Sequence, residues 1–391
     1  MRAVFRPAAA GLVIDTERRG GKLAGFATST GRSLTGQSQH KVYLFDALAG
    51  TGPSAEFELT SLQLTASGLM TSTGTADPSF APTDPGAQAL AVLGDTLWVG
   101  CANLMSSADP SASFLDNFPG LVLGFALDPL DHTRFEPGVP QPAHVVFTRG
   151  FNVTGLRAAR TPDGRPVLYV TTSGAGRVLF GASPPEADHA FLEVIDPNKA
   201  QLVAFFPFGP AAARHAAAVR PDGLEAVVGR GDFGFGLAEI FRVSLLELDL
   251  VLDGTIQAPA DLTGAILNGV ANPITIPFAN PDKPPTGRFT SALAYSNDGG
   301  RRLLAVSFND STLNVFDARR GRTPVFRRQH RLSRGNETAD TFGPNASVLA
   351  LRPGLPGRDF QGPDAFVGTI GVLVDPQTFT TRAVLDAART Y

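Results

Sequence analysis

Short apolar runs separated by turn residues recur along the whole chain. The stretch from Ser291 to Arg320 shows the pattern most simply, with apolar runs over 291–295, 303–308 and 313–316 separated by SNDGG and NDS. Runs of this length, bounded by Gly, Asn, Asp and Ser, are typical of antiparallel strands joined by tight turns. The stretch therefore predicts three strands of a β-meander.

The strand–turn–strand pattern can be aligned six times. The six copies begin at Leu12, Ala89, Leu156, His215, Ser291 and Ser347. Each copy is followed by a third apolar run that ends in a short polar residue, usually Asp before Ala or Pro. These residues are Asp46, Asp128, Asp196, Ser244, Asp317 and Asp375. Asp and Ser side chains can accept a hydrogen bond from the main chain just beyond them, which ends a strand in a turn.

A fourth apolar run follows most of the copies. Consecutive four-stranded antiparallel sheets, none of which can bury both faces alone, predict an all-β chain that forms a single β-propeller domain over residues 1–391. We expect six blades of four strands, with seven as the alternative, because residues 253–285 could hold a degenerate blade. The expected blades cover approximately residues 10–66, 87–151, 152–209, 210–270, 288–334 and 345–391.

Two of the copies carry a Pro-Asp-Gly turn, in TPDGRPVLYV and RPDGLEAVV, and the first of these is followed by a strand that closes in VIDP. Recurring over most of the chain, this pattern resembles the repeats of the YVTN and lactonase-like propellers. Two features depart from that family: the repeats here are longer, and the family often has seven blades. The resemblance implies a propeller fold and, for its lactonase-like members, an active site at the mouth of the central channel.

Composition narrows the class of protein. The chain has 42 Gly and 31 Pro among 391 residues, with 43% hydrophobic and only 18% charged residues, which suits many short strands and is too apolar for a disordered chain. The net charge is −3, and Lys and Arg are scattered without a basic stripe, so we expect no nucleic-acid partner. The one cysteine, Cys101, excludes an internal disulfide and lies in an apolar run, so we expect a buried structural thiol.

No run of apolar residues is long enough for a transmembrane segment, and the first residues lack the apolar core of a secretory signal. The sparse charge and the Ser-, Thr- and Gly-rich loops favour a periplasmic, cell-surface or secreted protein, with any leader absent from this numbering.

Connection lengths predict one working face. The short connections are those expected on one face of a propeller, whereas the long ones, including residues 103–120, 173–189 and 230–236, fall on the other. Long loops concentrated on one face of a repeat array indicate its binding face. We take as candidate binding residues Asn103, Phe114, Arg177, Arg230, Asp232, Phe233 and Phe235. Arg-Gly-Asp at 230–232 is a tripeptide that arises often by chance, and the two Phe rings could meet a partner or fold back over a blade edge.

One histidine merits weighing as a catalytic residue. His215 follows Arg214 in FGPAAARHAAAV, at the start of an inner strand, which resembles the corresponding strand of lactonase-type propellers. There the pair could act as a base and an oxyanion partner. The alternative that we favour is a polar residue packed against a neighbouring blade.

Spacing of His, Asp and Glu gives no metal motif, the GxG segments do not open a helix after a strand, and we assign no cofactor. The sequence therefore predicts a non-enzymatic binding or scaffold protein, a bacterial envelope or extracellular assembly subunit that engages a protein partner through its long-loop face. It could act within an oligomer or larger assembly. A lactonase-like hydrolase is the alternative.

Overall fold

The computed structural model describes the chain in segments. They are residues 9–32, 38–49, 52–59, 69–70, 76–77, 86–102, 119–138, 141–174, 189–210, 216–231, 238–269, 272–277, 290–296, 299–307, 312–331, 349–351, 365–367, 372–374 and 381–384. Within them the chain is almost entirely strand, with one short α-helix (α1, Leu248–Leu252) and a 3₁₀ turn at Thr263–Ala265. The predicted all-β class is confirmed.

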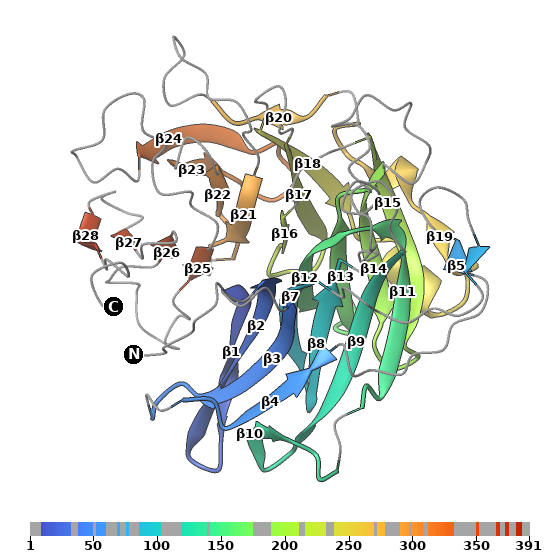
Figure 1. Ribbon diagram of the computed structural model, residues 1–391. Coiled ribbons are helices and arrows are strands. Elements are labelled where there is room, and N and C mark those ends of the chain that lie inside the picture. Colours follow the sequence, from blue (N-terminus) through green and yellow to red (C-terminus); the bar gives the residue numbers. More distant parts are fainter. Residues whose placement is uncertain are drawn as a thin grey trace. The chain divides into compact units, whose positions relative to one another are not determined.

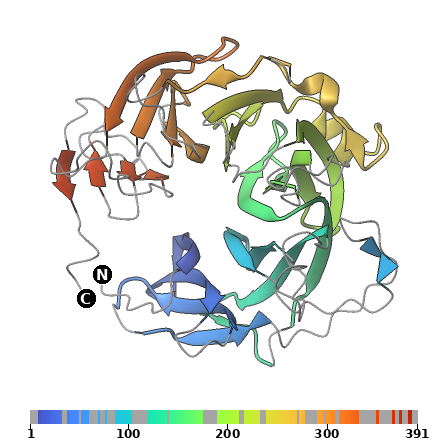
Figure 2. The same cartoon turned by 45° about the horizontal axis from the view of Figure 1, so that its top comes forward.

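Two compact units make up the chain. The first comprises residues 1–160, 165–210 and 250–261, and the second comprises residues 161–164, 211–249 and 262–391. In each unit, consecutive antiparallel strands lie side by side in twisted sheets (Figures 1 and 2).

The first unit contains three large sheets. One has the order β1 (Ala9–Arg19), β2 (Lys22–Arg32), β3 (Ser38–Asp46) and β4 (Ala55–Glu58). The next contains β7 (Ala87–Leu93), β8 (Thr96–Cys101), β9 (Pro119–Asp128), β10 (Asp131–Phe135) and β11 (His144–Phe151), and both β10 and β11 pair with β9. The third contains β12 (Val153–Arg160), β13 (Pro166–Thr172), β14 (His189–Asp196), β15 (Gln201–Pro210) and β19 (Ala260–Asp261). A small hairpin pairs β5 (Leu69–Met70) with β6 (Ala76–Asp77).

The second unit also contains three sheets. The first has the order β16 (Ala216–Val219), β17 (Glu225–Gly231), β18 (Ala238–Ser244) and β20 (Ile274–Thr275). The second has the order β21 (Thr290–Tyr295), β22 (Arg302–Ser307), β23 (Thr312–Asp317) and β24 (Val325–Arg331), which confirms the meander predicted from residue 291 onward. The third comprises β25 (Leu349–Leu351), β26 (Ala365–Val367), β27 (Val372–Val374) and β28 (Thr381–Val384).

Residues 253–285, considered above for a further blade, contribute their described strands to sheets that already exist. β19 runs parallel to β15, with Ala204 opposite Ala260, and β20 pairs with β18. These strands have two residues each, which is too short to produce a readable alternation of apolar and polar positions.

The cores lie between neighbouring sheets. In the first unit, Phe57 packs against Phe125 with their ring centroids 5.4 Å apart, and Trp98 is almost completely buried between the second and third sheets. In the second unit, a Cβ atom on Gly229 would lie 2.4 Å from the Cβ atom of Thr290, so glycine is what lets β17 approach β21 so closely. Cys101 is buried as predicted, and its burial raises the pKa of the thiol to about 12, which keeps it protonated.

Four of the six polar residues that end the third strands form the predicted turns, and Asp375 lies outside the described segments. The side chains of Asp46, Asp128 and Asp196 each accept a hydrogen bond, 2.9 Å long, from the main-chain N–H two residues later, and Ser244 accepts one of 3.4 Å. The residue that donates this bond can be exposed, as Leu130 is at 78%.

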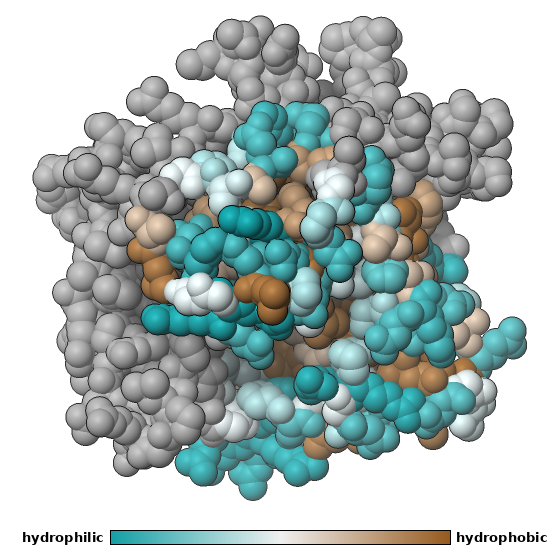
Figure 3. Space-filling model, turned by 90° about the horizontal axis from the view of Figure 1, so that it is seen from below, coloured by the Kyte–Doolittle hydropathy of each residue, from teal (hydrophilic) through white to brown (hydrophobic). Residues whose placement is uncertain are grey.

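Hydrophobic residues on the face shown in Figure 3 form small areas within a mainly hydrophilic surface. This distribution is ordinary for a folded protein.

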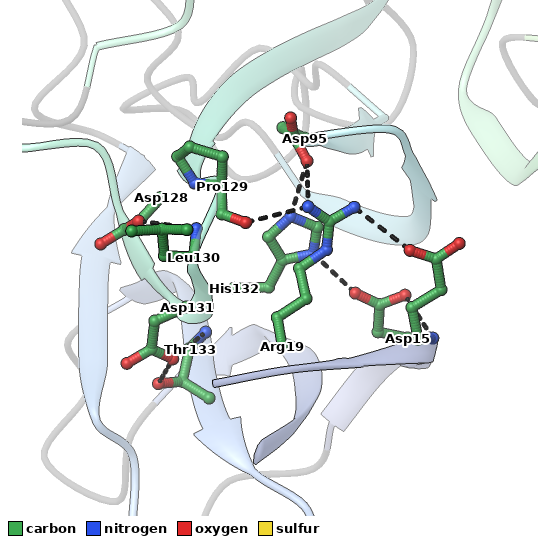
Figure 4. A network of polar contacts seen from close by, with 10 residues as sticks. Asp15, Arg19, Asp95, Asp128, Pro129, Leu130, Asp131, His132 and Thr133 are labelled. Atoms are coloured by element: carbon green, nitrogen blue, oxygen red, sulfur yellow. Dashed lines mark hydrogen bonds and ion pairs between the residues drawn. The ribbon is translucent and has the colours of Figure 1, made fainter. Parts of the chain in front are cut away.

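A charged network ties the first two sheets together at their short turns (Figure 4). The buried ring of His132 lies with Nδ1 2.6 Å from an Asp15 carboxylate oxygen on β1 and Nε2 3.1 Å from Asp95 in the β7–β8 turn. Arg19 lies 2.7 Å from Asp95 and donates to the main-chain oxygen of Pro129. Because these bonds join β1 to the β7–β8 turn and to β10, we interpret the network as a clamp between sheets.

Within the described segments, no helix is long and apolar enough to cross a membrane, and no group of His, Cys, Asp and Glu side chains could hold a metal ion.

Candidate functional site

The ends of the long connections in the first unit are described, although residues 103–118 and 175–188 are not. Three polar side chains gather at these ends: Gln88 on β7, Asn152 between β11 and β12, and Ser173 directly after β13. The amide nitrogen of Asn152 donates to the Ser173 hydroxyl at 2.6 Å, and that of Gln88 donates to the Asn152 side-chain oxygen at 3.4 Å. We refer to these three residues as the loop-base cluster.

Main-chain hydrogen bonds reinforce the cluster. The Ser173 N–H donates to the Asn152 carbonyl at 3.1 Å, and the Ala102 N–H donates to the Gly86 carbonyl at 3.0 Å. Asn152 has a φ of 61°, in the left-handed region, where Asn is tolerated better than most residues because its short polar side chain can bond locally. Asn at this position therefore tolerates the left-handed backbone conformation and also makes the two side-chain bonds of the cluster.

A buried carboxylate holds a bulge in β11, a few residues before Asn152 in the chain. The pairing of β11 with β9 is irregular between Phe147 and Phe151. The Glu193 carboxylate on β14 accepts a hydrogen bond from the Arg149 N–H at 2.7 Å and another from the Gly150 N–H at 2.9 Å. These main-chain donors belong to the irregular segment, so Glu193 satisfies groups that the β9–β11 ladder does not pair.

Burial makes Glu193 sensitive to pH. The side chain is completely inaccessible to water, and this desolvation raises the pKa of its carboxyl to about 7, although the two main-chain bonds and the Thr172 hydroxyl oppose the shift. The Arg149 guanidinium lies over the Phe205 ring at 4.5 Å, which fixes the side chain that flanks the bulge. Glu193 is therefore an internal anchor that can change its charge near neutral pH.

The chemistry of this end of the unit is that of a fixed polar frame. Gln88, Asn152 and Ser173 bond to one another, and Glu193 bonds inward to the main chain. The frame fixes the points from which the long connections start.

Of the residues predicted from sequence to bind or react, the described segments contain Arg230 alone. It lies near the end of β17, and its guanidinium donates twice to one Glu239 oxygen on β18, at 2.9 and 2.7 Å, while lying 4.9 Å from the centre of the Phe241 ring. These contacts close the base of the β17–β18 connection. That Arg230 binds a partner stays a prediction.

The other predicted residues lie outside the described segments. They are Asn103, Phe114, Arg177, Arg214, His215, Asp232, Phe233 and Phe235. Sequence reasoning did not select the loop-base cluster or Glu193. A signal for Glu193 existed, because it is a single acidic residue inside the apolar run of β14, HAFLEVID.

The consecutive antiparallel sheets and the structural neighbours, which are β-propellers, define the class of protein. The chain is a β-propeller repeat protein. It is similar to Kuenenia stuttgartiensis hydrazine synthase, with 14% identity over 93% of this chain and 74% of that chain and a TM-score of 0.53. It is also similar to the periplasmic gluconolactonase PpgL of Pseudomonas aeruginosa, with 16% identity over 96% of this chain and 84% of that chain and a TM-score of 0.51.

A third similar structure belongs to the outer coat vertex of COPII on membranes, with 9% identity over 96% of this chain and 75% of that chain and a TM-score of 0.51. No protein-family model matches the sequence, and no curated protein matches it. At such low identity the neighbours show the fold alone, and their different names show that this fold carries unrelated functions.

Proposed function

We propose that this chain is a six-bladed β-propeller that works as a non-enzymatic binding or scaffold protein. In this proposal its long-connection face engages a protein partner in a bacterial envelope or extracellular assembly. Six large sheets of four or five strands in the described segments support the blade number.

One observation carries the proposal: the loop-base cluster. The Asn152 side chain joins Gln88 and Ser173, and these residues come from three separate strand ends. Loops that bind partners work best when a rigid scaffold fixes their ends, because less freedom is then lost on binding. The cluster provides such a scaffold for the connection that begins after residue 174.

A pull-down with a loop variant tests the proposal. The chain is purified under mild conditions from its native source, alongside a variant in which residues 176–187 are replaced by a Gly/Ser segment of equal length. The control is Glu56→Gln, which changes an exposed side chain on β4. We expect a stoichiometric partner with the wild type and the control, and loss of that partner with the loop variant. Equal recovery with all three proteins would contradict the proposal.

A lactonase-like hydrolase is the second candidate, because β16 is the first strand of its sheet and begins at Ala216, directly after Arg214 and His215. A catalytic part for the two residues is proposed from their position in the sequence next to this strand. A purified monomer that hydrolyses δ-gluconolactone, and loses this activity in His215→Ala, would establish the enzyme in place of the scaffold.

A further inference from the structure

The outer edge of β24 is an exposed strand edge of the second unit. β24 is the last strand of its sheet and pairs on its inner side with β23, from Val325 opposite Asp317 to Arg331 opposite Thr312. Among the described residues no further strand pairs with its outer edge. Edge strands that are long and exposed act as templates for another strand unless the protein blocks them.

Another sheet of the same chain shows that an outer edge of this kind accepts an added strand. β15 is the fourth strand of its sheet, and β19 is added to it in parallel, with Ala204 opposite Ala260 and Phe205 opposite Asp261. β24 holds the equivalent fourth place in its own sheet and has seven residues.

Apolar side chains on β24 are exposed where an added strand would meet them. Val325 is 54% exposed and Phe326 is 37% exposed, so both side chains are accessible to a partner. The Phe326 ring is held in place because it packs edge-on against Phe316 with the centroids 5.7 Å apart. The edge therefore offers ordered apolar area next to its main chain.

The hairpin formed by β23 and β24 is strongly basic. Residues 317–328, DARRGRTPVFRR, contain five arginines and one acidic residue, although the whole chain has a net charge of −3. Arg319, Arg320 and Arg327 are each more than half exposed. The single acidic residue of this segment, Asp317, lies within ion-pair distance of both Arg319 and Arg327, and Arg320 lies 3.8 Å from Asp222 in the β16–β17 turn. The hairpin is thus a local concentration of basic residues in a chain whose Lys and Arg are otherwise scattered.

We propose that the outer edge of β24 is a second docking surface, and that its ligand is an acidic, extended segment of a partner protein that adds to the sheet as a strand. Main-chain pairing would supply affinity, and the arginines would select acidic side chains. The net negative charge of the chain and the single exposed ring on β24 disfavour a nucleic acid, which needs an extended basic surface and stacking rings.

The probe is a fluorescent peptide of about ten residues that alternates Glu and Val, so that one face is acidic and the other apolar. Its binding to the full chain is measured by fluorescence anisotropy, and amide hydrogen exchange is followed over Val325–Arg331. A second peptide carries N-methyl groups on alternate amides, which blocks strand pairing but keeps the charge. A single-stranded DNA of about the same charge serves as a competitor.

The test variant is Arg320→Glu combined with Arg322→Glu, in the turn that leads into β24. The matched control is Arg134→Glu combined with Lys199→Glu, which reverses the same number of exposed charges in the first unit. We expect the test variant to weaken peptide binding by about tenfold or more and the control by less than about twofold. We also expect slower exchange of β24 amides in the complex and no binding of the N-methyl peptide.

Several results would overturn the proposal. They are no binding of the Glu/Val peptide at about 100 μM, equal weakening by the control variant, equal binding of the N-methyl peptide, or tighter binding of the DNA. The long-connection face is tested separately, by replacing residues 176–187. The proposal for one surface can therefore be contradicted while the proposal for the other holds.

Discussion

The carboxylate of Glu193 accepts a hydrogen bond from the main-chain N–H of Gly150 at 2.9 Å, across 43 positions of sequence. Its other oxygen accepts one from the Arg149 N–H at 2.7 Å. Strand β14 of the third sheet therefore holds the irregular part of β11 in the neighbouring sheet. This contact supports the corner at Asn152, from which the candidate site is built.

Replacing Glu193 with Gln should destabilise the first unit. Both carboxylate oxygens accept from N–H groups, so the NH₂ of Gln would place a donor against a donor in a site without water. We expect a loss of about 1–3 kcal/mol in the free energy of unfolding, measured by urea denaturation. Glu56→Gln, on an exposed side chain of β4, is the control and should change stability by less than about 0.5 kcal/mol. An equal effect of the two substitutions would contradict the anchoring role.

The same residue predicts a pH dependence. Burial raises the folded-state pKa of Glu193 to about 7, above its ordinary value of 4.5, so the folded chain binds this proton more tightly than the unfolded chain. The contribution to stability is therefore present at low pH and is lost as the pH rises from about 4.5 to about 7.

Urea unfolding of the wild type and Glu193→Gln across this range measures the effect. The stability difference between them should narrow as the pH rises. A difference that stays constant would show that Glu193 does not titrate in this range, and one that widens would show that folding lowers its pKa instead of raising it.

Asn152 gives a third prediction, because its backbone and side chain act separately. Its φ of 61° strains most residues other than Gly, and its side chain bonds to Gln88 and Ser173. Asn152→Ala removes the two side-chain bonds and strains the backbone, so we expect it to lower the free energy of unfolding by about 2 kcal/mol. Asn152→Gly removes only the bonds, so we expect it to lower the free energy of unfolding by about 1 kcal/mol. Amide exchange at Ser173 and Gly174 should accelerate in both variants. Equal costs would exclude a backbone contribution.

Local rules made much of the fold predictable from sequence. The turn at Asp128 involves the N–H of Leu130, two residues away, and the same relation recurs at Asp46 and Asp196, so short-range chemistry repeated along the chain revealed the repeat. The strands of the meander around Leu303 were likewise readable from apolar runs bounded by turn residues.

Contacts between sheets were not predictable, because no pattern along the chain specifies the partner of a buried polar residue. The position of Glu193 in an apolar strand predicts that it needs partners, but these are 43 and 44 residues earlier. His132 is similar: its partner Asp15 is 117 residues away. Proposals for His215, Arg177 and the other loop residues stay predictions, since they depend on parts of the chain outside the described segments.

The His132 network yields the last prediction, because one ring contacts two carboxylates in different surroundings. The Asp15 side chain is 7% exposed, whereas the Asp95 side chain is 50% exposed and also lies 2.7 Å from Arg19. Removing one partner of a buried hydrogen bond leaves the other polar group desolvated and unpaired, whereas water replaces the partner of an exposed group. We expect Asp15→Ala to cost about 3 kcal/mol and Asp95→Ala less than about 1 kcal/mol in the free energy of unfolding. A double-mutant cycle with His132→Ala should assign most of the Asp15 cost to its coupling with His132. Equal losses for the two aspartates, or no coupling, would show that the clamp does not depend on the buried half of the network.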